Sequence, residues 1–358
     1  MCGFGAGTCF PRQRSGPAKG SGVDALRQNG HAEDGPLVSA IIPAFNAAKT
    51  IEETLRSVRA QTHRNLEILV VDDGSTDETV RIAEAHAAED SRLRIIRQPN
   101  GGVAAARNTG VLNANAAFVA PIDADDIWAP AKIERQLAAM RASPNATLCY
   151  TWFAWLDHRG RVVGYGARHT AEGDVLAAMC RTNLVGNGSG AMMRKDAMLA
   201  AGLYDPSLRA RAAEGCEDYK LYLALAAMGD VLVVPDFLTG YRFLPNNMSS
   251  DIAQMCRSHL IVLDEFGAKH PHLAPHLEEG RRVFASWQVM RALRALRIGK
   301  IPELLWTLAR EDSHAAIALA ASTPSFVARR ALSRVRRLFP EAGQTRQPKP
   351  FPIGMPDA

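Results

Sequence analysis

Between residues 37 and 141 the sequence alternates short apolar runs with longer amphipathic segments. Four apolar runs have the length of buried strands, at residues 37–43, 66–72, 93–97 and 117–123. A segment of helical length follows each run, at residues 47–59, 76–88, 102–112 and 130–141. Because strands that alternate with helices form βαβ units, the pattern predicts an α/β domain with a mostly parallel central sheet.

Two acidic clusters lie at the ends of predicted strands. Asp72-Asp73-Gly74-Ser75-Thr76-Asp77 follows the second apolar run, and Asp123-Ala124-Asp125-Asp126 follows the fourth. Either cluster alone is typical of an ordinary turn or a solvated loop. Their joint placement favours a ligand site, because ligands of open α/β sheets bind at the carboxyl ends of the strands.

Carboxylates at a strand end suit a nucleoside diphosphate accompanied by a hard cation. Mg²⁺ and Mn²⁺ bind oxygen ligands, and Mg²⁺ is usually held by one or two carboxylates together with phosphates and water. Asp123 and Asp125 are separated by a single residue, so one side chain can face a ribose while the other reaches the metal. Asp73, on the other strand end, can accept a hydrogen bond from a base N–H. These clusters therefore predict a nucleotide-sugar and metal site.

The composition disfavours several other classes of protein. The chain has 358 residues and is 47% hydrophobic, which is typical of a globular enzyme. Six cysteines without a C-x-x-C pair predict neither a zinc framework nor a disulfide scaffold, and they favour a reducing, cytoplasmic setting. No run approaches the roughly 18 apolar residues that span a bilayer. A dehydrogenase is disfavoured, because the first strand leads into Pro43-Ala44-Phe45-Asn46 instead of a glycine-rich turn.

Four short motifs in the correct order resemble those of family-2 glycosyltransferases of the GT-A fold. The resemblance extends from residue 37 to about residue 250. Its motifs are the opening strand, the base-binding loop, the diphosphate-side helix and the Asp-x-Asp metal motif, at residues 38–46, 70–77, 100–110 and 123–126. The implied substrate is a nucleotide-diphosphate sugar, with a UDP-sugar as the first candidate.

The resemblance also implies roles for individual residues. Pro43, Phe45 and Asp73 are expected to surround the base, and Arg107 to lie near the nucleotide. Asp123 is expected near the ribose, and Asp125 on Mg²⁺ or Mn²⁺. For Arg107 the plain alternative is a solvated charge on a helix surface.

The candidate for the catalytic base lies in the second half of the chain. Direct displacement needs a carboxylate that takes the proton of the acceptor hydroxyl while the metal stabilises the departing diphosphate. Glu217-Asp218 opens a predicted helix and resembles the Glu-Asp motif of the family, in which the Asp is the base. The plain alternative is that acidic residues favour the first turn of a helix because of its dipole. We assign Asp218 as the base, with Glu217 beside it.

Residues 241–249 resemble the loop that follows the catalytic motif in this family. That loop often carries a His before the Pro, where this chain has Leu244. Arg242 and Ser249 are the candidates to replace such a His at the metal or the diphosphate. The Gln/Arg-rich motif of processive synthases is missing, so we expect transfer of a single sugar to a saccharide or a lipid-linked acceptor.

The expected organisation has four parts. They are a disordered leader, a GT-A domain, a helical extension and a disordered tail, at residues 1–35, 36–250, 251–340 and 341–358. Within the GT-A domain, residues 36–130 form the nucleotide-sugar and metal half and residues 131–250 the acceptor half.

One rival function, that of a sugar nucleotidyltransferase, requires a glycine-rich loop with a basic residue after the first strand. A second rival is a non-catalytic binding or assembly protein of the same fold, against which Asp125 and Asp218 argue.

The basic residues of the chain gather near its end. Residues 281–349 hold fourteen Lys or Arg against four Asp or Glu. Between residues 324 and 339 the apolar residues fall on one helical face and the arginines on the other, which is typical of a helix lying in an anionic membrane surface. We hypothesise peripheral attachment to the cytoplasmic leaflet. The alternative is that the stripe packs on the catalytic lobe. Nucleic-acid binding is disfavoured, because the basic face lacks interleaved aromatic residues.

Truncation at Ser322 tests the membrane hypothesis. We expect the full chain to co-sediment with anionic vesicles, and the truncated chain to lose this binding because it lacks the basic helix. Equal sedimentation of the two chains would contradict the hypothesis.

Overall fold

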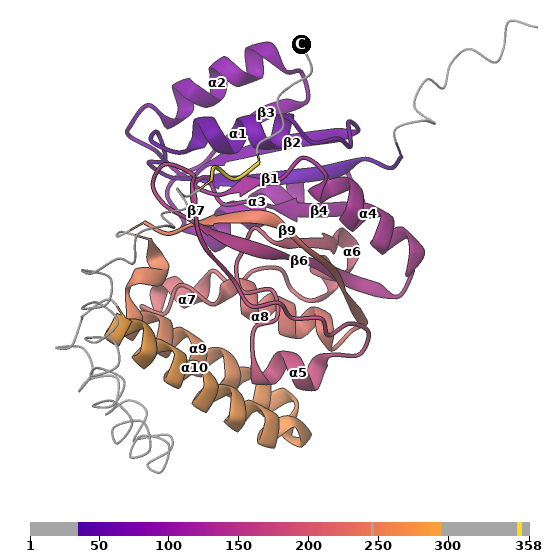
Figure 1. Ribbon diagram of the computed structural model, residues 1–358, viewed down its shortest axis with the longest axis vertical. Coiled ribbons are helices and arrows are strands. Elements are labelled where there is room, and N and C mark those ends of the chain that lie inside the picture. The colour runs from indigo at the N-terminus through magenta and orange to yellow at the C-terminus, as the bar shows by residue number, and fades with distance from the viewer. Residues whose placement is uncertain (1–34, 245–246, 295–348, 353–358) are drawn as a thin grey trace, which may run out of the picture. The chain divides into compact units, whose positions relative to one another are not determined.

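The structure is a computed structural model that describes residues 35–244, 247–294 and 349–352 (Figure 1). The predicted leader up to residue 34 and the predicted basic helix at residues 324–339 lie outside the described residues.

The first half of the chain alternates strands and helices as predicted. Its elements in chain order are β1 Val38–Ala44, α1 Ile51–Arg59, β2 Leu66–Asp72, α2 Thr79–Glu89, β3 Leu93–Arg97, α3 Val103–Asn113 and β4 Phe118–Pro121. Helices α1 and α2 begin later than predicted because the residues before them form linked turns. The N–H of Ala47 donates to Thr79 Oγ1 at 2.7 Å, and the N–H of Ala48 donates to Asp77 Oδ2 at 3.1 Å.

The second half adds strands to the same sheet and helices around it. Its first elements are β5 Ile127–Trp128, α4 Lys132–Ala142, β6 Ala146–Leu156, β7 Val162–Tyr165, α5 Leu176–Arg181, β8 Ala191–Arg194 and α6 Lys195–Ala200. The remaining elements are α7 Ser207–Ala210, α8 Glu217–Ala226, β9 Asp230–Arg242, η1 Met248–Ser250, α9 Ile252–Lys269, η2 Pro271–Leu273 and α10 Ala274–Arg294.

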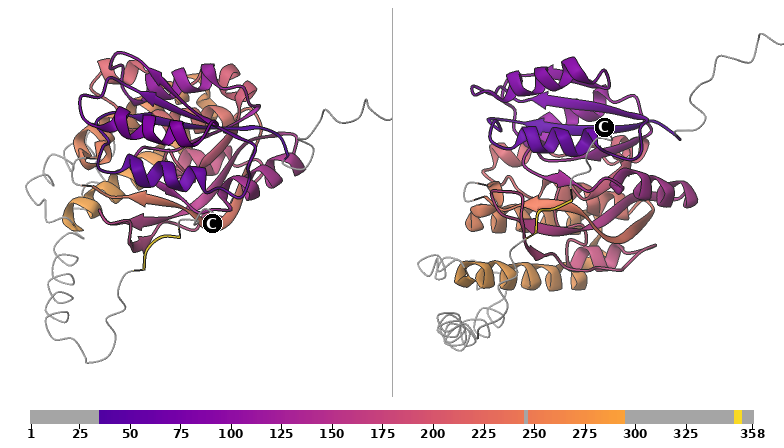
Figure 2. Two further views of the ribbon diagram at one scale, coloured as in Figure 1. Left: turned by 90° about the horizontal axis from the view of Figure 1, so that it is seen from above. Right: turned by 45° about the horizontal axis from the view of Figure 1, so that its top comes forward.

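The strands form one mixed sheet in the order β3-β2-β1-β4-β8-β6-β9-β5, with β7 paired to β6. From β3 to β4 every pair is parallel, which confirms the predicted α/β class. Beyond β4 the pairing is mixed, since β8 is antiparallel to both β4 and β6 while β6 and β9 are parallel. The parallel half is covered by α1 and α2 on the side that lies uppermost in Figure 1, and the two views of Figure 2 show the same arrangement.

Alternate residues of the strands enter different apolar clusters. In β1, Ala40 and Ile42 belong to the cluster that includes α1, α2 and α4, whereas Ile41 belongs to the cluster with α3, α5, α8 and α9. This is the side-chain alternation expected of a strand buried on both faces. Gly110 permits the close approach of α3 to β1, because a Cβ at this position would lie 2.3 Å from Ile41 Cγ2.

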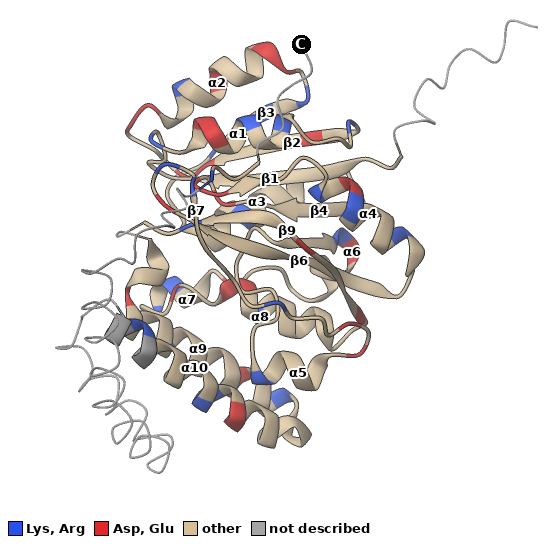
Figure 3. Ribbon diagram, in the orientation of Figure 1, with Lys and Arg blue, Asp and Glu red and all other residues tan. Residues whose placement is uncertain are grey.

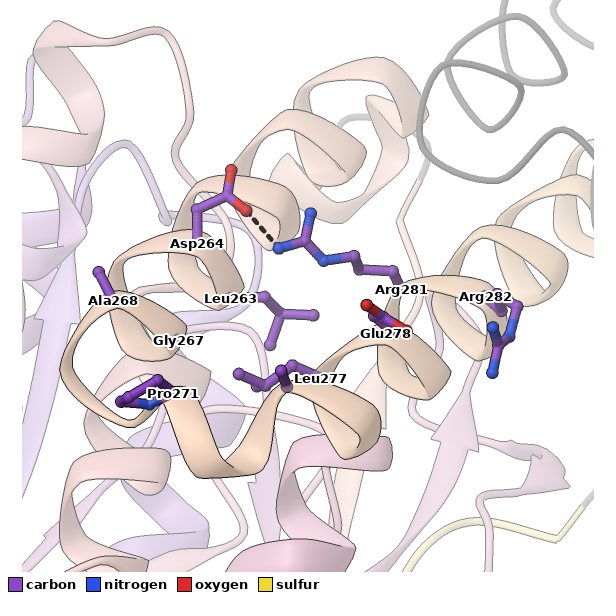
Figure 4. A pocket seen from close by; sticks show the side chains of 10 residues that line it. Leu263, Asp264, Gly267, Ala268, Pro271, Leu277, Glu278, Arg281 and Arg282 are labelled. Atoms are coloured by element: carbon purple, nitrogen blue, oxygen red, sulfur yellow. Dashed lines mark hydrogen bonds and ion pairs between the residues drawn. The ribbon is translucent and has the colours of Figure 1, made fainter.

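Helices α9 and α10 form an antiparallel pair that packs beside α8 and α5. They confirm the predicted helical extension up to residue 294. A cavity of about 700 Å³ lies between them, with Leu263 and Leu277 in its wall and the ion pair of Asp264 and Arg281 beside it (Figure 4). None of the lining residues is a predicted site residue. In the described part of the chain, no helix has the length and apolar character needed to cross a bilayer.

Four residues of the predicted disordered tail are described, and they contact the sheet domain. The N–H of Val162 donates to the Lys349 carbonyl at 2.9 Å, and the N–H of Phe351 donates to the Gly160 carbonyl at 3.1 Å. The Phe351 side chain is buried in the cluster that contains Ile127 and Leu156. Because Phe351 is an isolated aromatic residue between prolines, its burial could not be inferred from a periodic pattern.

Candidate active site

The carboxyl ends of three neighbouring strands meet at one edge of the sheet. β1 pairs with β2 as far as Ala44 and Asp72. The N–H of Ile122 donates to the Ile41 carbonyl at 2.9 Å, which keeps the chain beside β1 until Asp123. Five predicted residues follow or end these strands: Pro43, Phe45, Asp73, Asp123 and Asp125.

Asp73 anchors the glycine loop that leads into α3. Its buried carboxylate accepts hydrogen bonds from the N–H groups of Gly101 and Gly102, both at 2.8 Å, and from Gln98 Nε2 at 2.7 Å. An ionised carboxylate has about four acceptor positions. Roughly one position is therefore left for the base N–H that the sequence predicted as its partner.

The loops that follow β1 and β2 are tied to each other. Asn46 has a φ of 49°, in the left-handed region that Asn tolerates. Its N–H donates to Ser75 Oγ at 3.0 Å, and its Oδ1 accepts from the N–H of Thr76 at 2.9 Å. Of the other two residues expected around the base, Pro43 is buried in the sheet while Phe45 is 52% exposed. Only Phe45 presents a free ring surface to a ligand.

Arg107 on α3 is the central cation of the site. Its buried guanidinium donates to Asp123 Oδ1 at 2.6 Å and to Glu217 Oε1 at 3.1 Å, and the Tyr204 ring centre lies 5.3 Å from its Cζ. Burial opposes the charge, but Asp123 and Glu217 together raise the pKa of Arg107 well above its usual value. Arg107 is therefore a permanent positive link between the loop after β4 and the N-terminus of α8.

The loop from Asp123 to Asp126 folds into a turn whose internal anchor is Asp126. The buried Asp126 carboxylate accepts from Ser189 Oγ at 2.5 Å and from the N–H of Arg242 at 2.8 Å. Ser189 Oγ in turn accepts from the N–H of Asp123 at 3.0 Å. Burial, followed by the charges of Asp125 and Asp123, raises the pKa of Asp126 well above its usual value.

Asp125 is the carboxylate of this turn that fits a divalent cation. Burial, followed by the charge of Asp123, raises its pKa to about 7, while Arg242 and Asn247 act in the opposite direction. A cation would favour the ionised form of such a crowded carboxylate. Within the described ranges, no three His, Cys, Asp or Glu side chains converge into a group that could hold a metal ion. The cation would therefore need further ligands such as phosphate oxygens and water.

Arg242, predicted to act at the metal or the diphosphate, braces the turn from behind. The side chain is 1% exposed. Its Nε donates to the Asp125 carbonyl at 2.7 Å, one terminal nitrogen donates to the His158 carbonyl at 3.1 Å, and the other pairs with Glu53. The guanidinium is thus engaged with protein groups at each nitrogen. The other candidate, Ser249, accepts a hydrogen bond from the Tyr241 hydroxyl at 3.3 Å.

Glu217 and Asp218 open α8 as predicted. Figure 3 shows where acidic and basic residues lie along the ribbon. The contacts of the two carboxylates differ. The buried Glu217 carboxylate accepts from Arg107 and from the N–H of Gly215 at 2.8 Å. Asp218 accepts from the N–H of Tyr219 at 2.6 Å. Burial, followed by the charge of Glu217, raises the pKa of Asp218 to about 7. A carboxyl that titrates near neutrality is suited to accepting a proton.

The structure brings the Asp123–Asp126 turn close to the Glu217-Asp218 pair. It also adds residues that the sequence analysis did not identify. Arg107 links Asp123 to Glu217, while Ser189 and Asp126 link the turn to the second half of the chain. Asp126 was detectable as part of its cluster, but no sequence signal gave it an anchoring role. Ser189 lies in an ordinary Gly-rich segment, so its contacts became apparent only in the fold.

Solved structures define the class of this fold. S. aureus TarS in complex with UDP-GlcNAc aligns with a TM-score of 0.59 at 18% identity, over 76% of this chain and 80% of that one. The mannosyltransferase PcManGT from Pyrobaculum calidifontis, in complex with GDP-Man and Mn²⁺, aligns with a TM-score of 0.53 at 18% identity, over 85% of this chain and 87% of that one. The chain has the GT-A fold.

The sequence comparisons give the family. Residues 39–198 match the family model for glycosyl transferase family 2, and this domain belongs to that family. Chondroitin synthase of Escherichia coli is 37% identical over 131 residues, which cover 37% of this chain and 19% of that protein. Glycosyltransferase GlyG of Streptococcus pneumoniae serotype 4 is 39% identical over 92 residues, which cover 25% of this chain and 31% of that protein. The chain thus spans under a third of the length of these two relatives.

The raised pKa of Asp218 predicts a pH-dependent cost in stability. A carboxyl with a higher pKa in the folded state destabilises the fold progressively as pH rises from about 4, its unfolded pKa, to about 7. We expect Asp218→Asn to match the wild type in thermal stability near pH 4 and to exceed it at pH 8, by about 2–4 °C per kcal/mol released. Thermal unfolding at both pH values measures this, and a variant that is less stable at pH 8 would contradict it.

Proposed function

We propose that the protein transfers a single sugar from a nucleotide-diphosphate sugar to a hydroxyl acceptor by metal-assisted direct displacement, with inversion at the anomeric carbon. The observation that carries this proposal is the Asp123–Arg107–Glu217 link. It ties the loop predicted to bind the nucleotide and metal to the helix that bears the predicted base. The family of residues 39–198 supports the same reaction class.

Asp125 is the residue that would hold Mg²⁺ or Mn²⁺, with phosphate oxygens of the donor and water as further ligands. When bound, the ion would stabilise the negative charge on the departing diphosphate. Asp123 is fixed by Arg107 at 2.6 Å and has a side chain that is 26% exposed, which suits a hydrogen bond to the ribose. Phe45, exposed at the end of β1, would cover one face of the base.

Asp218 would act as the general base of the transfer. Its carboxylate takes the proton of the acceptor hydroxyl as the acceptor oxygen bonds to the anomeric carbon. The bond from that carbon to the diphosphate oxygen breaks at the same time, and the nucleoside diphosphate leaves. Glu217 cannot share this role easily, because Arg107 and the N–H of Gly215 already occupy its oxygens. Glu217 instead holds the N-terminus of α8 in place.

The site and the solved structures of similar fold support a proposal for the substrate class. TarS was solved with UDP-GlcNAc and PcManGT with GDP-Man. We propose a UDP-sugar as the first donor to test, and a saccharide or lipid-linked saccharide as acceptor. Aromatic residues of the second half support a saccharide, since the rings of Trp155 and Tyr241 lie 5.2 Å apart and neither side chain is fully buried.

Asp125→Ala tests the nucleotide and metal site. We expect the wild type to bind UDP or GDP in a Mn²⁺-dependent way by calorimetry, and the variant to lose most of this binding because it lacks the cation ligand. Asp236→Ala, which removes a half-exposed carboxylate paired with Arg135, is the matched control and should bind normally. If the wild type binds none of UDP, GDP and dTDP, the proposal is contradicted and a non-catalytic protein of this fold is favoured.

Asp218→Asn tests the base. We expect kcat to fall by about 10²–10⁴-fold with unchanged nucleotide affinity, because only proton transfer is lost. In the wild type, kcat/KM should fall tenfold per pH unit below about pH 7, where Asp218 becomes protonated. Glu278→Gln, exposed on α10, is the control. Undiminished turnover in the Asp218→Asn variant would show that this residue is not the base. Release of pyrophosphate from a sugar phosphate and a nucleoside triphosphate would instead indicate a nucleotidyltransferase.

A further inference from the structure

Residues 349–352, the C-terminal strap, pair with the turn between β6 and β7. Two backbone hydrogen bonds flank an antiparallel bridge between Arg161 and Pro350: Val162 N–H to the Lys349 carbonyl at 2.9 Å and Phe351 N–H to the Gly160 carbonyl at 3.1 Å. The strap therefore adds a short strand to this turn, although it lies more than fifty residues beyond α10 in the sequence.

The Phe351 ring occupies space that a glycine leaves open. Phe351 is 4% exposed. A Cβ at Gly240 would lie 3.1 Å from Phe351 Cδ1 and 2.6 Å from Leu156 Cδ1, so a larger side chain on β9 would crowd both. Gly240 pairs with Ile127, two residues after Asp125. The ring thus packs on the strand pair β5–β9, directly beyond the Asp123–Asp126 turn.

Residues 157–161, which the strap contacts, also bind Arg242, the residue that supports the Asp123–Asp126 turn. The Asp157 carboxylate holds residues 157–161 in place by accepting from the N–H groups of Arg159 at 2.9 Å and Arg161 at 3.0 Å. The His158 carbonyl in this turn accepts from Arg242 at 3.1 Å, and Arg242 Nε donates to the Asp125 carbonyl at 2.7 Å. A continuous series of contacts therefore runs from Phe351 to the backbone of Asp125.

We propose that the C-terminal strap is a positioning element for the cation-binding turn, with Phe351 as its positioning residue. Docking of the strap fixes residues 157–161, which fixes the guanidinium of Arg242 and through it the Asp125 backbone. One buried ring and two backbone hydrogen bonds must offset the entropy of ordering the strap. The contact is therefore a modest one, and its effect should appear in cation affinity more than in folding. The metal part of this inference rests on the proposed function.

Two pairs of chains test the strap. A chain that ends at Pro348 lacks the strap, and a chain that ends at Pro352 keeps it and serves as the control. Phe351→Ala removes the ring, and Phe351→Leu retains an apolar side chain. Calorimetry with UDP or GDP, whichever the wild type binds, gives the Mn²⁺ concentration for half-maximal binding. We expect about a 10-fold increase for the Pro348 chain and for Phe351→Ala. The two controls should stay near the wild type, and kcat at saturating Mn²⁺ should change little.

A second measurement does not depend on the metal. Hydrogen exchange at the Val162 and Arg242 amides should accelerate in the Pro348 chain but not in the Pro352 chain, because the strap pairs with Val162 and supports the brace. Equal Mn²⁺ dependence in both chains, or unchanged exchange at Arg242, would overturn the inference. If the wild type binds no nucleotide with Mn²⁺, the proposed function fails, while the exchange experiment still decides whether the strap holds Arg242.

Discussion

The site depends on one buried guanidinium that is shared by two carboxylates. Arg107 lies between Asp123 from the first half of the chain and Glu217 from the second. Removing one partner of a buried ion pair costs about 3–5 kcal/mol, because the other charge is left without compensation. Since the two carboxylates come from segments 94 residues apart, the link fixes the loop after β4 relative to the N-terminus of α8. Lysine at this position would not make the same two ion pairs equally well, because only the planar guanidinium of arginine holds several N–H donors in fixed directions.

The carboxylates of the site other than Asp123 form two groups, which differ in how fully protein groups satisfy them. Asp73, Asp126 and Glu217 each accept at least two hydrogen bonds from protein groups, and each of them fixes a loop or a helix end. Asp125 and Asp218 have pKa values raised to about 7, with burial as the largest cause. Burial also raises the pKa of Asp126, but its carboxyl is already engaged by Ser189 and the Arg242 amide. Ionisation of Asp125 and Asp218 is costly unless a cation or a substrate proton compensates for it. The same crowding that disfavours the charged state therefore suits these two residues to chemistry.

The sequence was sufficient for the features that depend on local pattern. Apolar runs of strand length predicted β1 to β4 and their parallel pairing, and the acidic residues that follow β2 and β4 lie at one edge of the sheet. It was not sufficient for the tertiary contacts of long side chains. Arg242 follows an aromatic residue on β9, and nothing in the local sequence predicts that its guanidinium is buried against the Asp125 carbonyl. The mixed pairing of β6, β8 and β9 was equally hidden, because antiparallel and parallel neighbours of a buried strand have similar apolar composition.

Support for the Asp123–Asp126 turn comes from three distant parts of the chain. Ser189 holds Asp126 and the Asp123 amide from the loop before β8, and Arg242 holds the Asp125 carbonyl from the end of β9. The strap supports Arg242 through residues 157–161. A surface loop with few contacts of its own would sample many geometries, and each of these braces removes part of that freedom. Because a hard cation requires its oxygen ligands within narrow distances, we propose that these contacts would raise the affinity of the turn for a cation by ordering the turn in advance, without contacting the cation themselves.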